Sequence, residues 1–96
     1  MVRTARRGAD GRRDGNQKPI VDALRAAGVD VVTISKAGIP DLLTAHNGRT
    51  VLLEVKNKGG KLTDDQRTFL SAWQGEAYVV FTPAEALAVF GIEVTE

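Results

Sequence analysis

The 96-residue chain has no cysteine and only one histidine, His46. Without cysteine, disulfide bonds and thiolate metal sites are excluded, and a single imidazole argues against a zinc site of the usual nitrogen and sulfur type. A metal ion would therefore be held by oxygen atoms, which favours magnesium, manganese or calcium. There is also no apolar run as long as a membrane span and no signal-peptide core, so we expect a cytoplasmic protein without membrane contacts.

The net charge is small, but the charged residues are unevenly distributed along the chain. The formal net charge is +1, yet residues 1–18 hold six basic and two acidic residues, a net +4. We interpret residues 1–15 as a flexible basic N-terminal arm and residues 16–96 as one folded domain. Arg12 and Arg13 in such an arm can bind phosphates through counterion release. The alternative is a solvated tail that only improves solubility.

Periodicity and turn residues predict an α/β domain with the order αβββαβα. The expected elements are a helix from Asn16 to Gly28, strands at Val29–Ser35, Asp41–His46 and Arg49–Lys56, a helix from Thr63 to Gly75, a strand at Ala77–Phe81 and a helix from Pro83. Apolar residues occur on both faces of the third strand, which predicts a central strand with helices on each side. In the second helix we expect an inward face that includes Phe69, Leu70 and Trp73, with Trp73 in the core and not on a base-stacking surface.

The dipeptide Asn47-Gly48 predicts a two-residue type I′ hairpin turn, because both central residues of that turn need a positive φ. Opposed residues then have numbers that sum to 95, which places Asp41 opposite Glu54 on one face of the sheet. Lys56 lies two residues after Glu54 and therefore shares that face. A three-residue bulged loop would shift this register by one.

Two opposed carboxylates repel each other, and a divalent cation between them is the simplest remedy. Glu54 interrupts an apolar strand, where a buried charge costs several kcal/mol unless it is paired. Two alternatives need no metal. Asp41, which follows Pro40, can be a simple turn residue, and Glu54 can form a structural ion pair with Lys56.

Three motifs together resemble the VRR-NUC group of the PD-(D/E)XK nuclease superfamily. They are Gly38-Ile39-Pro40-Asp41-Leu42-Leu43, then Leu53-Glu54-Val55-Lys56, then Gly60-Lys61-Leu62-Thr63 with Gln66 and Phe69. The resemblance covers roughly residues 16–90. It implies a restriction-endonuclease-like αβββαβ core with a mixed central sheet flanked by helices. Stand-alone members, common in phages and bacteria, are similar to Holliday-junction resolvases that act as homodimers on branched DNA.

The resemblance also implies residue roles. Asp41 and Glu54 would bind Mg²⁺ or Mn²⁺, and the Val55 carbonyl would be a further ligand. Lys56 would position or deprotonate the attacking water and stabilise charge on the phosphate, which agrees with the chemistry of phosphodiester hydrolysis. The resemblance places Gln66 beside the metal site, although a capping-box role alone is the alternative.

The chain departs from the family pattern at the first helix, where members usually carry a glutamate that supports the metal site. Asn16 is the best positional match, and its amide oxygen can reach a metal or a bound water without adding charge. Asp14 is the alternative if the helix starts earlier. The departure bears on metal affinity more than on the class of reaction.

The resemblance therefore implies a divalent-metal-dependent DNA endonuclease that is selective for DNA structure. Two alternatives stay open: a homodimeric Holliday-junction resolvase, and a non-catalytic DNA-binding module with a vestigial nuclease site. The candidate DNA contacts are Arg12, Arg13, Lys36, Lys58 and Lys61. For the lysines, a solvated protein face is the alternative interpretation.

Overall fold

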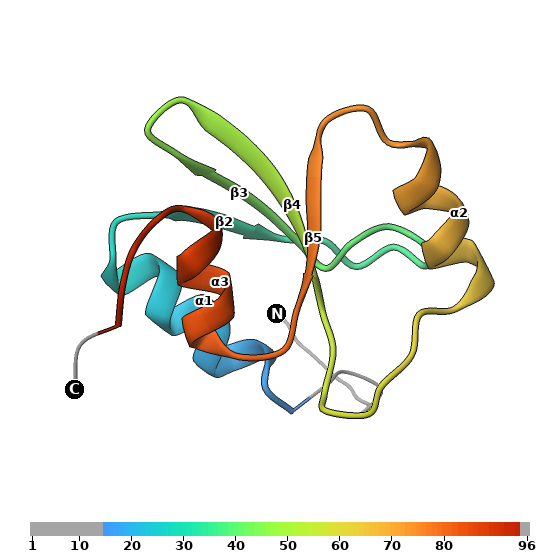
Figure 1. Ribbon diagram of the computed structural model, residues 1–96, viewed down its shortest axis with the longest axis horizontal. Helices are drawn as coiled ribbons and strands as arrows, with labels where there is room; N and C mark the ends of the chain where they lie inside the picture. The colour runs from blue at the N-terminus through green and yellow to red at the C-terminus, as the bar shows by residue number, and fades with distance from the viewer. Residues whose placement is uncertain (1–14, 95–96) are drawn as a thin grey trace.

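A four-stranded mixed sheet with three helices forms the framework of the computed structural model, which describes residues 15–94 (Figure 1). The elements are α1 (Gln17–Ala26), β2 (Asp30–Thr33), β3 (Leu42–His46), β4 (Arg49–Val55), α2 (Asp64–Ala72), β5 (Glu76–Val80) and α3 (Pro83–Val89). The α/β class and the order of elements are confirmed. The predicted basic arm lies outside the described residues except for Gly15.

The sheet has the strand order β2-β3-β4-β5, in which β2, β3 and β4 are antiparallel and β5 is parallel to β4. The β3–β4 register confirms the predicted hairpin, since His46 pairs with Arg49 and the remaining pairs also sum to 95. Asn47 and Gly48 have φ values of 51° and 81°, as a type I′ turn requires. A two-residue turn fixes the register, so every side chain of the hairpin has a determined face.

Helices α1 and α3 cover one face of the sheet and enclose the core. Ile20 and Leu24 of α1 are fully buried, and Gly28, with a φ of 88°, reverses the chain after the helix. Every second residue of β4 points into this core. The core residues are Ile20, Val21, Leu24, Val29, Val31, Leu42, Val51, Leu53, Val55, Val80, Ala86 and Leu87.

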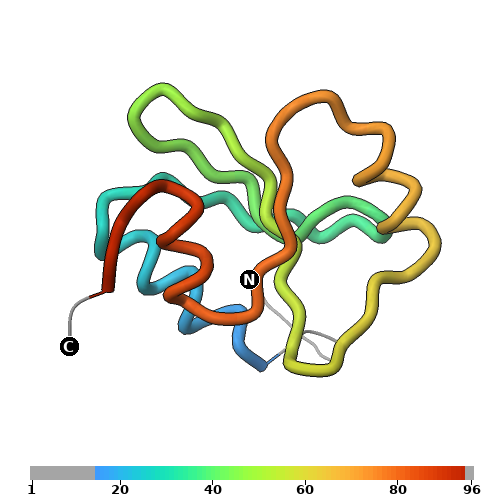
Figure 2. The backbone as a smooth tube through the Cα atoms, in the orientation of Figure 1, coloured from blue at the N-terminus to red at the C-terminus, as the bar shows by residue number. Residues whose placement is uncertain are grey.

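The opposite face of the sheet is only partly covered. One row of side chains crosses three strands on this face, and the exposed fraction falls from 57% at Val32 through 38% at Leu43 to 6% at Leu52. Helix α2 stands on this side, apart from α1 and α3, and the loop between β2 and β3 extends toward it (Figure 2). A Cβ added at Gly38 in that loop would lie 3.3 Å from the Cβ of Asp65. The loop therefore approaches α2 at its first turn.

Helix α2 begins with the predicted capping box and ends earlier than expected. The Thr63 side chain accepts a hydrogen bond from the Gln66 backbone, and the Gln66 side chain accepts one from the Thr63 backbone. The predicted inward face is confirmed in part, because Gln66, Phe69 and Leu70 are partly buried while the other residues of α2 are exposed. The prediction of Trp73 in the core is wrong, because this residue, just after the helix, is 45% exposed. Apolar spacing gave α2 a preferred side, but among the described residues no side chain of the helix is fully buried.

Within residues 15–94, none of the helices has the length and apolar composition needed to cross a membrane.

Candidate active site

Asp41 and Glu54 lie side by side on the sheet face that α2 approaches. Glu54 is in β4 and points away from the core, which contains its neighbours Leu53 and Val55. Asp41 comes directly before β3, and its Oδ2 accepts a hydrogen bond of 2.9 Å from the Val55 backbone. The predicted pairing of the two carboxyl groups follows from the confirmed register, continued by one residue beyond Leu42.

Glu54 is a buried carboxyl group with an unusual proton affinity. Its side chain is 2% exposed, and this burial is the main reason why its pKa is raised from 4.5 to about 7. The nearby negative charge of Asp41 raises the pKa further, whereas the Lys56 ammonium lowers it. Without another cation, Glu54 is therefore partly protonated near neutral pH.

The two oxygens of Glu54 have different surroundings. Oε2 accepts a hydrogen bond of 3.0 Å from Gln66 Nε2 and lies 3.6 Å from Lys56 Nζ. Oε1 is buried and has no hydrogen-bond partner among the described residues. A buried acceptor left without a partner costs about 1–3 kcal/mol, so this oxygen is suited to a cation that the protein itself does not supply.

Gln66 orients Glu54 as well as closing the capping box. Its Oε1 accepts the Thr63 backbone N–H at 2.9 Å, which turns its Nε2 toward the carboxylate. The two predicted interpretations of Gln66 are therefore not exclusive, because the cap of α2 fixes the amide that reaches the site. Lys56, which shares the face, is also well held, with a side chain that is 14% exposed.

The Val55 carbonyl lies at the point where the β3–β4 ladder ends. Continued by two residues, the register places Pro40 opposite Val55, and proline has no N–H to donate. The Val55 N–H donates instead to the side chain of Asp41, at Oδ2. Pro40 therefore cannot donate a hydrogen bond to the Val55 carbonyl. This fits the metal-ligand role that the resemblance implies for that carbonyl.

Asn16 reaches the same region from the start of α1. Its Nδ2 donates hydrogen bonds to the backbone carbonyls of Lys56, at 2.9 Å, and Phe81, at 2.6 Å. Its Oδ1 is buried and has no hydrogen-bond partner among residues 15–94. The amide therefore attaches α1 to the ends of β4 and β5 and keeps an oxygen near the backbone of Lys56.

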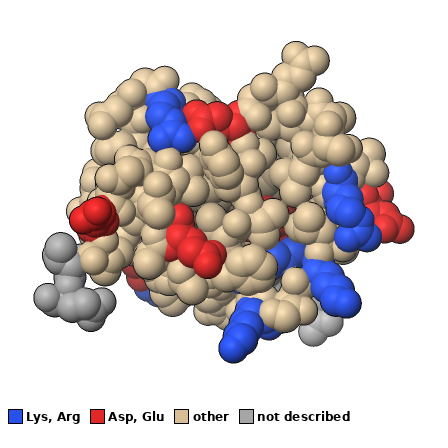
Figure 3. Space-filling view, viewed as in Figure 1, with Lys and Arg blue, Asp and Glu red and all other residues tan. Residues whose placement is uncertain are grey.

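The predicted DNA contacts surround the site only in part. Lys36, Lys58 and Lys61 are exposed on the loops that precede Asp41 and α2. Lys and Arg side chains gather over the lower right of the face in Figure 3, where Figure 1 places the loop between β4 and α2. Arg12, Arg13 and Asp14, the alternative to Asn16, lie outside the described residues.

The acidic part of the site consists of two carboxylates. Among residues 15–94, no group of three or more His, Cys, Asp or Glu side chains is arranged to hold a metal ion.

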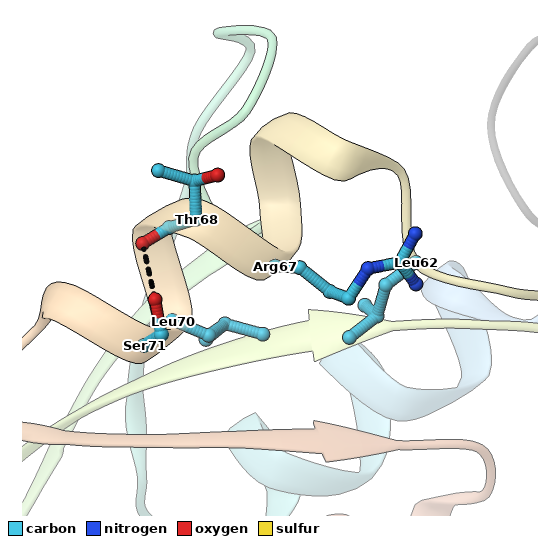
Figure 4. A pocket seen from close by; sticks show the side chains of 5 residues that line it. All are labelled: Leu62, Arg67, Thr68, Leu70 and Ser71. Carbon is cyan, nitrogen blue, oxygen red and sulfur yellow. Dashed lines mark hydrogen bonds between the residues drawn. The ribbon is translucent and has the colours of Figure 1, made fainter.

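An open pocket of about 580 Å³ lies at α2, where Leu62 and Leu70 extend toward each other (Figure 4). None of its lining residues belongs to the acidic pair: they are Leu62, Arg67, Thr68, Leu70 and Ser71.

Comparison with protein-family models, with curated proteins and with solved structures finds no match for this chain. The function is therefore argued from the geometry of the described residues. Two features of that geometry were not predicted from the sequence. The missing N–H of Pro40 opposite Val55 could have been predicted from the hairpin register, whereas the exposure of Trp73 could not.

Proposed function

We propose that this protein is a divalent-metal-dependent endonuclease that hydrolyses phosphodiester bonds in DNA. The observation that carries the proposal is the buried Glu54 Oε1, which has no hydrogen-bond partner among the described residues and belongs to a carboxyl group that contacts Asp41. A structural Glu54–Lys56 ion pair explains Oε2 but leaves Oε1 unexplained. The proposal includes a restriction-endonuclease-like core, with which the mixed sheet and its three helices are compatible.

The residues that would hold Mg²⁺ or Mn²⁺ are Asp41, Glu54 and the Val55 carbonyl, with Asn16 Oδ1 as a further oxygen toward the ion or its water. All four are hard oxygen donors, the kind that these ions prefer. When bound, such an ion polarises a phosphoryl oxygen and lowers the pKa of water. Glu54 must give up its proton to serve as a ligand, which couples binding to pH.

Lys56 and Gln66 have supporting roles in the proposed reaction. The Lys56 ammonium lies on the same face as the carboxylates and would stabilise the negative charge that develops on the phosphate, and it would also position the attacking water. Gln66 holds Glu54 Oε2, which leaves Oε1 directed away from that bond. Replacing Lys56 with methionine should lower the cleavage rate by roughly 10²–10³-fold, the usual cost of losing one such group.

DNA is the proposed substrate because cations border the site. Lys36, Lys58 and Lys61 are exposed on two loops. The sequence also has Arg12 and Arg13, which lie outside the described residues. A 10.3-kDa chain with one acidic site is suited to one strand at a time, so we propose that a homodimer would cut the two strands of a junction together. The homodimeric Holliday-junction resolvase is therefore a more specific version of this proposal, and cleavage of branched DNA would test it.

The experiment is a cleavage assay on duplex, flap, nicked and four-way-junction DNA, each with Mg²⁺, Mn²⁺ or EDTA. We expect metal-dependent cleavage that is lost in Glu54→Gln and in Asp41→Asn. Asp22→Asn is the matched control, because Asp22 is an exposed carboxylate that, within residues 15–94, pairs with Lys18 on α1, and this variant should cleave like the wild type. Preferred cutting of the four-way junction would identify a resolvase.

Two outcomes would count against the nuclease. If no substrate is cleaved while DNA is still bound, the protein is a binding module with a vestigial site. If Glu54→Gln cleaves as fast as the wild type, the acidic pair is not the active site.

A further inference from the structure

Trp73 is an exposed indole that its neighbours hold in place. Phe69 stacks on it with a distance of 5.2 Å between ring centroids and an angle of 20° between the planes. A Cβ added at Gly75 would lie 2.9 Å from the indole Nε1, so the absence of a side chain at Gly75 allows the indole to lie against the backbone. With one ring face on Phe69 and one edge on Gly75, the indole still exposes 45% of its surface.

The Phe69–Trp73 pair lies on the same side of α2 as the residue that contacts the acidic site. Gln66, Phe69 and Trp73 are spaced by three and four residues, so they follow one stripe along the helix. Gln66 begins the stripe with its hydrogen bond to Glu54. Trp73 is about 10 Å further along the axis at 1.5 Å per residue. That distance corresponds to about three stacked nucleotides at 3.4 Å each.

Two basic side chains lie near the start of this stripe. Lys58 and Lys61 are exposed on the loop that leads into α2, and the same region of Figure 3 carries a group of basic side chains. A strand whose phosphates lie on these lysines could continue along α2, so that a base a few nucleotides further on reaches the exposed indole. Single-strand binding sites combine these two elements, a basic path for the backbone and aromatic rings on which bases stack.

We infer that the substrate is a nucleic acid with unpaired nucleotides beside the scissile phosphate, and that one of its bases stacks on Trp73. The inference rests on the proposed function, to which it adds the class of substrate. In an intact duplex the bases are already stacked on one another and present no free face to the indole. Flaps, single strands and open junctions do present one.

The test uses the fact that Trp73 is the only tryptophan in the chain. Its fluorescence is therefore a direct report on stacking, and it can be recorded in EDTA, where cleavage is absent. We expect oligo(dT) to quench the emission of the full-length protein in a saturable way. A blunt duplex of the same length should bind with little quenching.

A pair of variants separates stacking from general affinity. Trp73→Leu should weaken binding of labelled oligo(dT) by roughly 5- to 150-fold, as expected for the loss of one base–aromatic stack. Tyr78→Leu is the matched control. Tyr78 is 42% exposed and shares the α1–α3 face with Val80, so the control variant should bind like the wild type.

Two results would overturn the inference. In one, oligo(dT) binds without quenching and with equal affinity to wild type and Trp73→Leu. In the other, the emission changes with protein concentration alone and not with oligo(dT), which would assign the indole to a contact between copies of the chain. Saturable quenching in a protein that cleaves nothing would support the stacking site and contradict the nuclease, so the two proposals fail separately.

Discussion

At the scale of single residues, Glu54 makes the stability of the folded protein depend on pH. Its pKa is about 7 in the folded state and 4.5 for an ordinary glutamate, so between these values the folded state binds more protons than the unfolded state. The free energy of unfolding therefore falls as the pH rises through this window. Below about pH 4.5 Glu54 is protonated in both states, so it causes no pH dependence of the free energy of unfolding there.

We predict that in EDTA the free energy of unfolding decreases from about pH 4.5 to pH 7 through this residue, by about 3 kcal/mol. Glu54→Gln should remove most of this slope, because the glutamine amide stays neutral across this pH range. Urea denaturation of both proteins across the pH range measures it. If the wild-type curve is no steeper than that of Glu54→Gln, ionisation of Glu54 costs the fold nothing.

At the scale of elements, α2 is fixed mainly by hydrogen bonds at its N-terminal end and not by buried side chains. The helix buries no residue, and its described contact with the sheet includes the Gln66–Glu54 hydrogen bond. Helix α3 has a similar threonine cap, in which Thr82 accepts a hydrogen bond from the Glu85 backbone, but it also buries Ala86 and Leu87. The two helices therefore differ in burial while they share a cap.

This difference predicts different responses to losing the cap. Thr63→Ala and Thr82→Ala should each cost about 1 kcal/mol, the usual value for an N-cap. In Thr63→Ala the cost should appear as faster hydrogen exchange in α2, by roughly 5-fold, with little change in Tm, because α2 can open locally. In Thr82→Ala it should lower Tm, because α3 contributes to the core. Equal decreases in Tm would contradict local opening of α2.

The register of the hairpin could be predicted from the sequence, but the exposure of Trp73 at the end of α2 could not. Asn47-Gly48 fixes a register locally, so the pairing of Asp41 with Glu54 follows from counting. The spacing of Phe69 and Trp73 indicates a side of the helix, but not whether another element lies against it. Gly75, expected to end the helix, instead makes room for the indole, which only the three-dimensional arrangement reveals.

At the scale of the whole molecule, the proposed ion would couple stability to the site. A ligand that binds only the folded state stabilises it by about 2.7 kcal/mol at 100 times its Kd. For a domain of this size, each kcal/mol raises Tm by roughly 4–8 °C. Since Glu54 must lose a proton to bind the ion, the stabilisation should be larger above its pKa than below it.

We predict that Mg²⁺ or Mn²⁺ raises Tm at about pH 8 and has much less effect at about pH 5. The increase should disappear in Glu54→Gln and persist in Asp22→Asn, whose exposed carboxylate lies on α1. Differential scanning fluorimetry with and without EDTA measures it. An equal increase in wild type and Glu54→Gln would show that the ion binds elsewhere.

The side-chain amide of Asn16 also bears on how the chain folds during its synthesis. Its two hydrogen bonds join residues that are 40 and 65 positions apart, and Phe81, the more distant one, comes after the last strand. Such long-range contacts form late in folding because their loops must close first. The first helix is therefore synthesised well before its partners, and we expect it to reach its native contacts only after Phe81 has been translated.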